Sequence, residues 1–316
     1  MAVFLYLIKL EQDISANNSN PMIMLKFIVN YSLNEKPLTV KDYVRYHLKF
    51  SLTAWRKLKA SGSITLNGET ASPISFVFPQ DILLLNMPTQ NTLLPIAGPL
   101  AICYEDEYLL AVNKPSGLLV HPTSTLHETT LANLVLYYYQ QQGLLSDFHP
   151  IHRLDRNTSG LLLIAKHAYI QQMLATSSLK SIARQYLALV TGELDCSGEI
   201  NAPIARKPGS IIERTVSPNG QEALTHYEVV QTYRNATLLR LILATGRTHQ
   251  IRVHLSHLGY PLLGDDLYGG QRTIIQRQAL HSASLTFPHP ITNEMIRLFC
   301  PIPPDMLQAI QKLQRK

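Results

Sequence analysis

The chain of 316 residues has only 3 cysteines, and none of its apolar runs is as long as a membrane span. The cysteines are odd in number and widely spaced, which argues against both a disulfide framework and a zinc-binding spacing. We therefore expect free thiols and a cytoplasmic location. The apolar run at residues 2–8 follows no basic segment, so a signal peptide is not expected.

Long polar tracts are also missing from the chain. Charged residues make up 16% and hydrophobic residues 46%, which excludes a largely disordered protein and leaves room for one or two domains with proper cores. The formal net charge of +6 permits a polyanionic partner such as nucleic acid, although it does not require one.

Basic residues concentrate between residues 36 and 59, where seven of them stand against Asp42 alone. Residues 38–44 and 52–58 each predict a short helix with one apolar face, and residues 62–69 predict a hairpin with an Asn-Gly turn. A solvated helix face is the alternative to a nucleic-acid surface. The candidate nucleic-acid contacts in this region are Lys49, Arg56, Lys57 and Lys59.

Residues 86–99 contain three prolines and no charged residue, which predicts a linker. We therefore divide the chain into an N-terminal domain, residues 1–92, and a larger domain, residues 93–316. Residues 1–21 match no pattern, and Met22 or Met24 is a candidate biological start.

Strand-like and helix-like runs do not alternate strictly in the larger domain. This order predicts an α+β fold on a mixed, largely antiparallel sheet rather than a doubly wound parallel sheet. The strand-like runs are residues 109–113, 161–165, 186–191, 225–230, 236–244 and 280–285. The helix-like runs are residues 130–141, 168–177, 247–257 and 305–316.

The most informative stretch is His-Arg-Leu-Asp-Arg at residues 152–156, which leads through a polar turn into an apolar strand-like run. Asp155 stands between two arginines, whose positive charge favours the ionised carboxylate. An ionised carboxylate at the end of a rigid strand is suited to act as a nucleophile or a base. Taken alone, such a triplet is more often an ion-pair cluster on the surface.

Five ordered motifs, however, resemble those of the RluA-type family of RNA pseudouridine synthases. The matching segments are residues 112–122, 152–166, 184–192, 245–269 and 280–290. The resemblance covers residues 102–301, and ordered motifs are far more specific together than singly. It implies a sheet with a catalytic cleft across its middle and an enzyme that isomerises uridine to pseudouridine in structured RNA.

The resemblance also implies roles for individual residues. Asp155 corresponds to the family's nucleophile, and whether it attacks the sugar or the base stays open. Arg153 corresponds to an arginine that fills the space of the flipped nucleotide and contacts the backbone. Tyr186 is implied to stack on the uracil and to accept the proton from carbon five. Arg247 is implied to pair with the nucleophile.

Structural roles are the alternatives to these catalytic ones. Tyr186 on a strand is suited to core filling, and Arg153 to a structural ion pair. Arg252 lies five residues after Arg247, about 140° further round a helix, so we expect it to bind phosphate or support the fold. His152 is expected to orient the loop and Lys114 to belong to a turn, and both are candidate RNA contacts.

Metals and cofactors are not expected. Isomerisation needs no redox change and no group donor. His249, His254 and His257 suggest a metal site at first sight, but no carboxylate or cysteine joins them at ligand spacing.

The helix–helix–hairpin order of the N-terminal domain resembles the S-four-like RNA-binding module. It departs from that module at residues 53–55, where Thr-Ala-Trp replaces the usual Ser-Arg pair. A module of this kind beside this type of catalytic domain resembles enzymes that modify large-subunit ribosomal RNA, and transfer RNA is the alternative substrate.

Two other functional classes compete with an RNA-modifying enzyme. A catalytically silent RNA-binding or chaperone protein of the same fold is disfavoured, because Asp155, Tyr186 and Arg247 are all present. A serine hydrolase is disfavoured, because no Gly-x-Ser-x-Gly elbow occurs. Nothing resembles a coiled coil, so we expect a monomer.

Overall fold

The computed structural model describes residues 22–32, 36–88, 93–122, 128–176 and 182–314, so the segment before Met22 lies outside the described residues. The chain divides into two compact units. The first unit contains residues 1–98, 132–149 and 165–176, and the second contains residues 99–131, 150–164 and 177–316. Helices from later in the chain thus group with the N-terminal segment, and the domain boundary at residues 92 and 93 stays a prediction.

The first unit is built on a four-stranded sheet in the order β1-β6-β3-β4. Its strands are β1 (Met22–Ile28), β6 (Ile82–Pro88), β3 (Ser63–Leu66) and β4 (Glu69–Thr70). The predicted hairpin is confirmed, and its turn residues Asn67 and Gly68 have φ of 52° and 89°, as this type of turn requires. The predicted linker was placed too early, because β6 pairs with β1 as far as Pro88.

Both predicted basic helices are present in this unit, but residues 38 and 39, predicted as helix, form a strand instead. Each begins at a hydroxyl cap, Thr39 and Ser51, which accepts a hydrogen bond from a free backbone N–H. The helical elements are α1 (Val40–Asp42) with the π-helix η1 (Tyr43–His47), α2 (Leu52–Ser61), α3 (Leu131–Gln141) and α4 (Ala168–Thr176). The strands β2 (Leu38–Thr39) and β5 (Phe76–Val77) form a separate pair.

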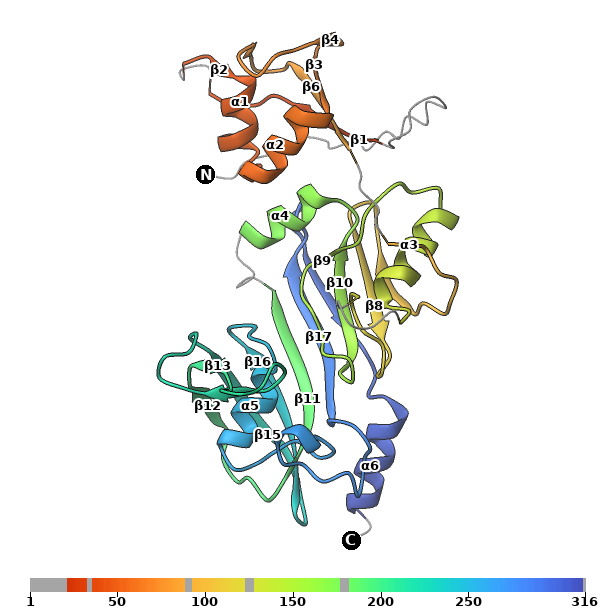
Figure 1. Ribbon diagram of the computed structural model, residues 1–316, viewed down its shortest axis with the longest axis vertical. Helices are drawn as coiled ribbons and strands as arrows, with labels where there is room; N and C mark the ends of the chain where they lie inside the picture. Colours follow the sequence, from red (N-terminus) through yellow and green to blue (C-terminus); the bar gives the residue numbers. More distant parts are fainter. Residues whose placement is uncertain (1–21, 33–35, 89–92, 123–127, 177–181, 315–316) are drawn as a thin grey trace. The chain divides into compact units, whose positions relative to one another are not determined.

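A ten-stranded sheet forms the second unit, with the path β12-β15-β16-β11-β17-β10-β8-β7 and with β18 beside β17 and β9 beside β10. Figure 1 shows the long strands β11 (Ala183–Thr191) and β17 (Leu280–Pro288) side by side. The other strands are β7 (Ile102–Glu105), β8 (Leu109–Lys114), β9 (His149–Pro150), β10 (Ser159–Ala165), β12 (Gly198–Asn201), β15 (Leu224–Tyr233), β16 (Ala236–Leu243) and β18 (Met295–Phe299). Strands β10 and β17 run parallel, whereas β11 is antiparallel to both β16 and β17. The predicted mixed, largely antiparallel sheet is confirmed.

Helices also pack on this sheet. Helix α6 (Pro304–Gln314) buries Met306, Ala309 and Leu313, whose spacing forms one apolar face. Helix α5 (Gln250–His257) contacts the small hairpin of β13 (Ile204–Arg206) and β14 (Arg214–Val216). The prediction that this helix begins at residue 247 is wrong. His249 has a left-handed φ of 59°, which a continuing α-helix does not allow, so the helix starts at Gln250.

Candidate functional site

Asp155 lies in the loop that enters β10, and buried hydrogen bonds hold this loop. Its backbone carbonyl accepts a hydrogen bond of 3.0 Å from the N–H of Thr158. The ammonium group of Lys114 donates to the carbonyls of Pro115, Leu118 and Arg156 at 2.8, 2.9 and 2.9 Å. Burial lowers the pKa of Lys114 to about 7, against the attraction of the Asp155 carboxylate. The prediction that Lys114 contacts RNA is wrong, because this side chain is fully buried and anchors the loop.

The strand that follows this loop needs a glycine at its second residue. Gly160 has a φ of 110°, and a Cβ there would lie 2.2 Å from the carbonyl oxygen of Ser282 on β17. Only glycine permits this close approach of the parallel strands, which fixes the loop relative to the sheet.

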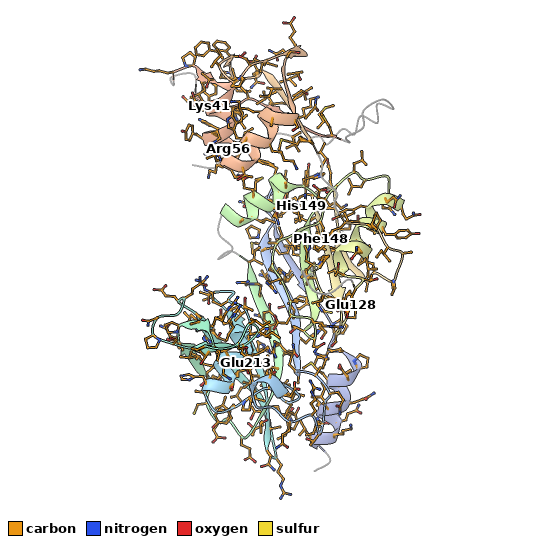
Figure 2. The ribbon with its side chains drawn as sticks, viewed as in Figure 1. Lys41, Arg56, Glu128, Phe148, His149 and Glu213 are labelled. Atoms are coloured by element: carbon orange, nitrogen blue, oxygen red, sulfur yellow. The ribbon has the colours of Figure 1, made fainter. Side chains whose placement is uncertain are left out.

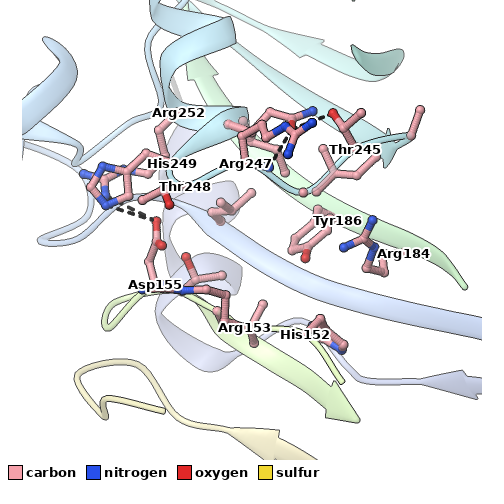
Figure 3. A pocket seen from close by; sticks show the side chains of 18 of the residues that line it. His152, Arg153, Asp155, Arg184, Tyr186, Thr245, Arg247, Thr248, His249 and Arg252 are labelled. Carbon is pink, nitrogen blue, oxygen red and sulfur yellow. Dashed lines mark hydrogen bonds and ion pairs between the residues drawn. The ribbon is translucent and has the colours of Figure 1, made fainter. Parts of the chain in front are cut away.

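A cleft of about 390 Å³ opens beside Asp155. It is lined by residues 151–155 and Thr158, by Arg184 and Tyr186 at the start of β11, by residues 243–252 and by Leu280 of β17 (Figure 3). All of these residues belong to the second unit, so one compact body carries the whole cleft.

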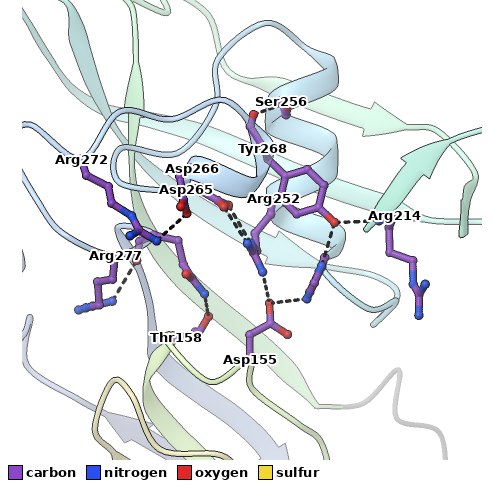
Figure 4. A network of polar contacts seen from close by, with 12 residues as sticks. Asp155, Thr158, Arg214, Arg252, Ser256, Asp265, Asp266, Tyr268, Arg272 and Arg277 are labelled. Atoms are coloured by element: carbon purple, nitrogen blue, oxygen red, sulfur yellow. Dashed lines mark hydrogen bonds and ion pairs between the residues drawn. The ribbon is translucent and has the colours of Figure 1, made fainter. Parts of the chain in front are cut away.

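The carboxylate of Asp155 is 19% exposed and pairs with Arg252, whose Nη1 lies 3.3 Å from Oδ2. Arg252 is itself held by Asp265, to which Nε and Nη2 each donate at 2.7 Å. Burial alone would lower the pKa of Arg252, but the hydrogen bonds and charge of Asp265 raise it. Such a two-point contact fixes the guanidinium plane and thereby aims it at Asp155 (Figure 4).

Two predictions about the partner of Asp155 are therefore wrong. Arg247 is exposed and donates from Nε to the carbonyl of Glu222 at 3.0 Å, while Arg252, expected to face elsewhere, pairs with the carboxylate. The angle between the two arginines was counted along one helix, but the left-handed residue His249 interrupts that helix. In the described part of the chain, Asp155 has no ion pair with either flanking arginine.

The side chains of the two flanking arginines, Arg153 and Arg156, are directed away from the Asp155 carboxylate. Arg156 donates from Nε to the carbonyl of Gly117 at 3.0 Å and from Nη2 to Glu128 at 2.9 Å. Arg153 is exposed and lines the cleft, as its predicted contact with a nucleotide requires.

A histidine and a tyrosine that the sequence reasoning did not assign complete this side. His249 places Nε2 3.8 Å from Asp155 and Nδ1 2.8 Å from the hydroxyl of Tyr268. That hydroxyl accepts the backbone N–H of Arg214, and the Tyr268 ring lies 4.8 Å below the guanidinium carbon of Arg252. Burial lowers the pKa of His249, so the imidazole is neutral at neutral pH. Only their place in the motif segment 245–269 distinguished these residues in the sequence.

Tyr186 and His152 lie on the opposite side of the cleft. Tyr186 is 4% exposed, and burial raises its pKa to about 12, so it is a phenol at neutral pH. Burial lowers the pKa of His152 to about 3. The Nε2 atom of His152 accepts the backbone N–H of Leu163 at 3.2 Å, which leaves the imidazole hydrogen on Nδ1. This bond ties the loop to β10, as expected of a residue that orients it.

The four basic residues predicted to contact nucleic acid belong to the first unit, where Figure 2 labels Arg56 on α2. Lys49, Arg56 and Lys59 are exposed, and Lys57 is half-buried. None of them lines the cleft.

The described residues contain no group of three or more His, Cys, Asp or Glu side chains that could hold a metal ion. His254 is fully buried and bonds Thr225 and the carbonyl of Ala202, both at 2.9 Å, which is a structural role. No helix in the described ranges has the length and apolar character needed to cross a bilayer.

Comparison with known proteins agrees with the motifs. A family model described as RNA pseudouridylate synthase matches residues 108–257. The chain is 41% identical over 281 residues to YjbO of Bacillus subtilis, called an uncharacterized RNA pseudouridine synthase, across 87% of this chain and 99% of that protein. It is 41% identical over 231 residues to the ribosomal large subunit pseudouridine synthase D of Haemophilus ducreyi, across 68% of this chain and 71% of that one.

A solved structure shares the fold. The protein titled human RNA pseudouridylate synthase domain containing 4 superposes with a TM-score of 0.56 at 24% identity, across 68% of this chain and 93% of that one. At this identity the likeness supports the α+β architecture.

Proposed function

Because this chain belongs to the RluA-type family of RNA pseudouridine synthases, it is an RNA-modifying isomerase, and we propose that Asp155 is its nucleophile. The observation that carries this assignment is a partly exposed carboxylate in a cleft, paired with a buried arginine that a second carboxylate fixes. A nucleophile must be accessible and held in one orientation, and Asp155 meets both requirements.

The reaction exchanges one bond for another within a single nucleotide. The N1–C1′ bond of uridine breaks, a C5–C1′ bond forms, the hydrogen leaves C5 and N1 gains one, so no atoms are added overall. If Asp155 attacks C1′, its oxygen forms an ester with the sugar and the uracil departs with the electron pair of N1. If Asp155 attacks C6, the electron pair of the C5=C6 bond moves to the ring carbonyl O4, and the N1–C1′ bond then breaks with its pair on N1. In the first route the Asp155 carboxylate leaves C1′ as C5 bonds to that carbon. In the second route it leaves C6 after the C5–C1′ bond has formed, as C5 loses its hydrogen and the C5=C6 bond reforms.

Three other residues of the cleft bind the nucleotide, accept the proton and position the nucleophile. Arg153, exposed at the cleft, takes the place of the extruded nucleotide and binds its phosphate, since removing a base from its stack costs a few kcal/mol. Tyr186 stacks on the uracil ring, a contact worth about 1–3 kcal/mol per base. Tyr186 also accepts the C5 proton, for which its phenol must first lose its own proton. Arg252 fixes the nucleophile rather than the RNA.

The substrate we propose is large-subunit ribosomal RNA, with transfer RNA as the alternative. The support is the 41% identity to a protein named for the ribosomal large subunit. We further propose that the first unit contains an S-four-like module whose exposed Lys49, Arg56 and Lys59, together with Lys57, bind phosphates of the same RNA. We propose that the enzyme acts in the cytoplasm as a monomer without a cofactor.

Mapping pseudouridines across all RNAs of a deletion strain tests this function. We expect one or a few uridines to lose their modification and to regain it when the wild-type gene is supplied, but not when Asp155→Ala is supplied. Restoration by Asp155→Ala would favour a catalytically silent RNA-binding protein. If parent and deletion strain have identical maps, the proposed substrate assignment fails.

A further inference from the structure

Three arginines in the second unit are almost completely buried, and they differ in what surrounds them. Arg252 is 7% exposed, and Arg277 and Arg184 are each 8% exposed. Arg252 donates to Asp265 at 2.7 Å through two nitrogens. Arg277 donates to Asp305 at 2.6 and 3.0 Å. A buried guanidinium is normally compensated in this way, because an unpaired charge in the interior is unfavourable.

Arg184 lacks such compensation. Its Nε atom is buried without a hydrogen-bond partner, and in the described ranges no ion pair or hydrogen bond of its guanidinium is found. The neighbouring residues 177–181 contain no aspartate or glutamate. A permanently charged and nearly buried group thus has no hydrogen-bond acceptor among the described side chains and carbonyls, and its Nε lies out of reach of solvent.

The unused donors lie in the cleft. Arg184 and Tyr186 stand two residues apart on β11 and both line the cavity. Figure 3 shows Arg184 beside Tyr186, on the side away from Asp155. The Arg184 guanidinium lies against Gly246: a Cβ there would come within 2.9 Å of its Nη1, so a larger residue would displace the guanidinium.

Building on the proposed function, we propose that Arg184 is a catalytic residue that donates hydrogen bonds to a carbonyl oxygen of the extruded uracil. A base stacked on Tyr186 brings its carbonyl edge beside the adjacent guanidinium. Departure of uracil from C1′ spreads negative charge over O2 and O4, and addition of Asp155 at C6 places it on O4. A cation at this edge stabilises the charge in either route, so the proposal does not depend on which atom Asp155 attacks.

The unpaired state of Arg184 is then a property of the enzyme without RNA. The uracil carbonyl supplies the missing acceptor, and the interaction strengthens as the carbonyl becomes charged in the transition state. The Arg184 charge is thus in place before RNA binds, and it stabilises the transition state more than it stabilises the folded chain.

The test uses the full-length enzyme and an RNA oligonucleotide spanning a uridine mapped as above, with release of tritium from C5 as the readout. Arg184→Met should lower kcat about 10²- to 10³-fold, the usual loss for one such donor, with little change in KM. Its melting temperature should stay the same or rise, because a buried unpaired charge has been removed. Arg184→Lys should retain part of the activity. The matched control is Arg240→Met on β16, which removes an arginine whose partner Glu228 lies at the surface, and it should leave kcat unchanged.

Two further measurements separate substrate contact from a structural role. Replacing O2 or O4 of the target uracil by sulfur, a poorer acceptor, should slow the wild type for at least one position and should not slow Arg184→Met further. Gly246→Ala, which displaces the guanidinium, should lower kcat, and it should have no added effect in the Arg184→Met background.

Several outcomes overturn the proposal. They are an unchanged kcat in Arg184→Met, a lower melting temperature that accounts for the loss, and thio-substitution effects equal in the two enzymes. A wild type that releases no tritium from the mapped RNA would instead reject the proposed function, so the two failures are distinguishable.

Discussion

The two ends of the cleft differ in how their charges are compensated. At the Asp155 end, the buried charges already have partners: Arg252 contacts two carboxylates, and Asp265 is only 1% exposed and receives two hydrogen bonds. Around Tyr186, the Arg184 guanidinium has no partner in the described part of the chain. The first end is complete before RNA arrives, whereas the second becomes complete only with a bound base.

This difference corresponds to two tasks. A nucleophile needs one orientation, and buried carboxylate–arginine contacts provide it. A group that stabilises developing charge needs free donors at the moment of reaction, and a protein partner would occupy them. The comparison therefore predicts opposite consequences for stability and catalysis at the two ends.

Asp155→Asn should have the largest effect, because it removes the attacking oxygen charge. We expect kcat to fall by about 10⁴-fold or more, with RNA binding nearly unchanged. Stability should change little, since Arg252 keeps both hydrogen bonds to Asp265. Tritium release and thermal unfolding measure the two quantities, and substantial remaining turnover would contradict the assignment of the nucleophile.

The free energy of unfolding should distinguish the two ends of the cleft most clearly when Arg252→Met is compared with Arg184→Met. Loss of Arg252 leaves Asp265 buried and unpaired, which should cost about 3–5 kcal/mol of unfolding free energy. Loss of Arg184 should cost none. Urea unfolding of both variants beside Arg240→Met measures this contrast, and equal destabilisation would erase the proposed difference between the ends.

Tyr186 allows a pH test at the uncompensated end. Burial raises its pKa to about 12, so the phenolate fraction increases tenfold for each pH unit between 7 and 9. If the phenolate accepts the C5 proton, kcat should rise in the same proportion, and Tyr186→Phe should remove both the activity and its pH dependence. A flat profile with an active Tyr186→Phe enzyme would leave stacking as the only role of the ring.

The smallest effects are expected outside the cleft, where cations are solvated. Arg56→Gln and Lys59→Gln should each weaken RNA binding a few-fold without changing kcat. Each should reduce the slope of log affinity against log salt by about one, as expected for one lost phosphate contact. Lys312→Gln on α6 is the control, being an exposed lysine of the second unit. Unaltered slopes in both variants would reject a docking role for this surface.

The parts of the fold that sequence reasoning recovered depend on local pattern. Continuous apolar runs identified β8 and β10, and the Asn-Gly pair identified the hairpin after β3. Tyr186 and Asp155 were found because their motifs resemble a known family, and both line the cleft.

The parts that were missed depend on non-local contacts or on a single backbone angle. Arg252 was expected to face away from Asp155 because its angle to Arg247 was counted along one helix, whereas His249 adopts a left-handed conformation that no residue pattern announces. Lys114 was taken for an RNA contact because its three carbonyl partners, one of them 42 residues away, cannot be read from spacing. Arg184 was overlooked because its significance lies in lacking a partner, which only a folded chain can reveal.

The buried ammonium of Lys114 has a mechanical consequence. Because it joins the turn at residues 115–118 to the carbonyl of Arg156, these distant segments behave as one rigid block. A change in the turn is therefore transmitted to the neighbouring Asp155. It should lower the rate of the chemical step, because the carboxylate is misaligned, and leave the affinity for RNA unchanged.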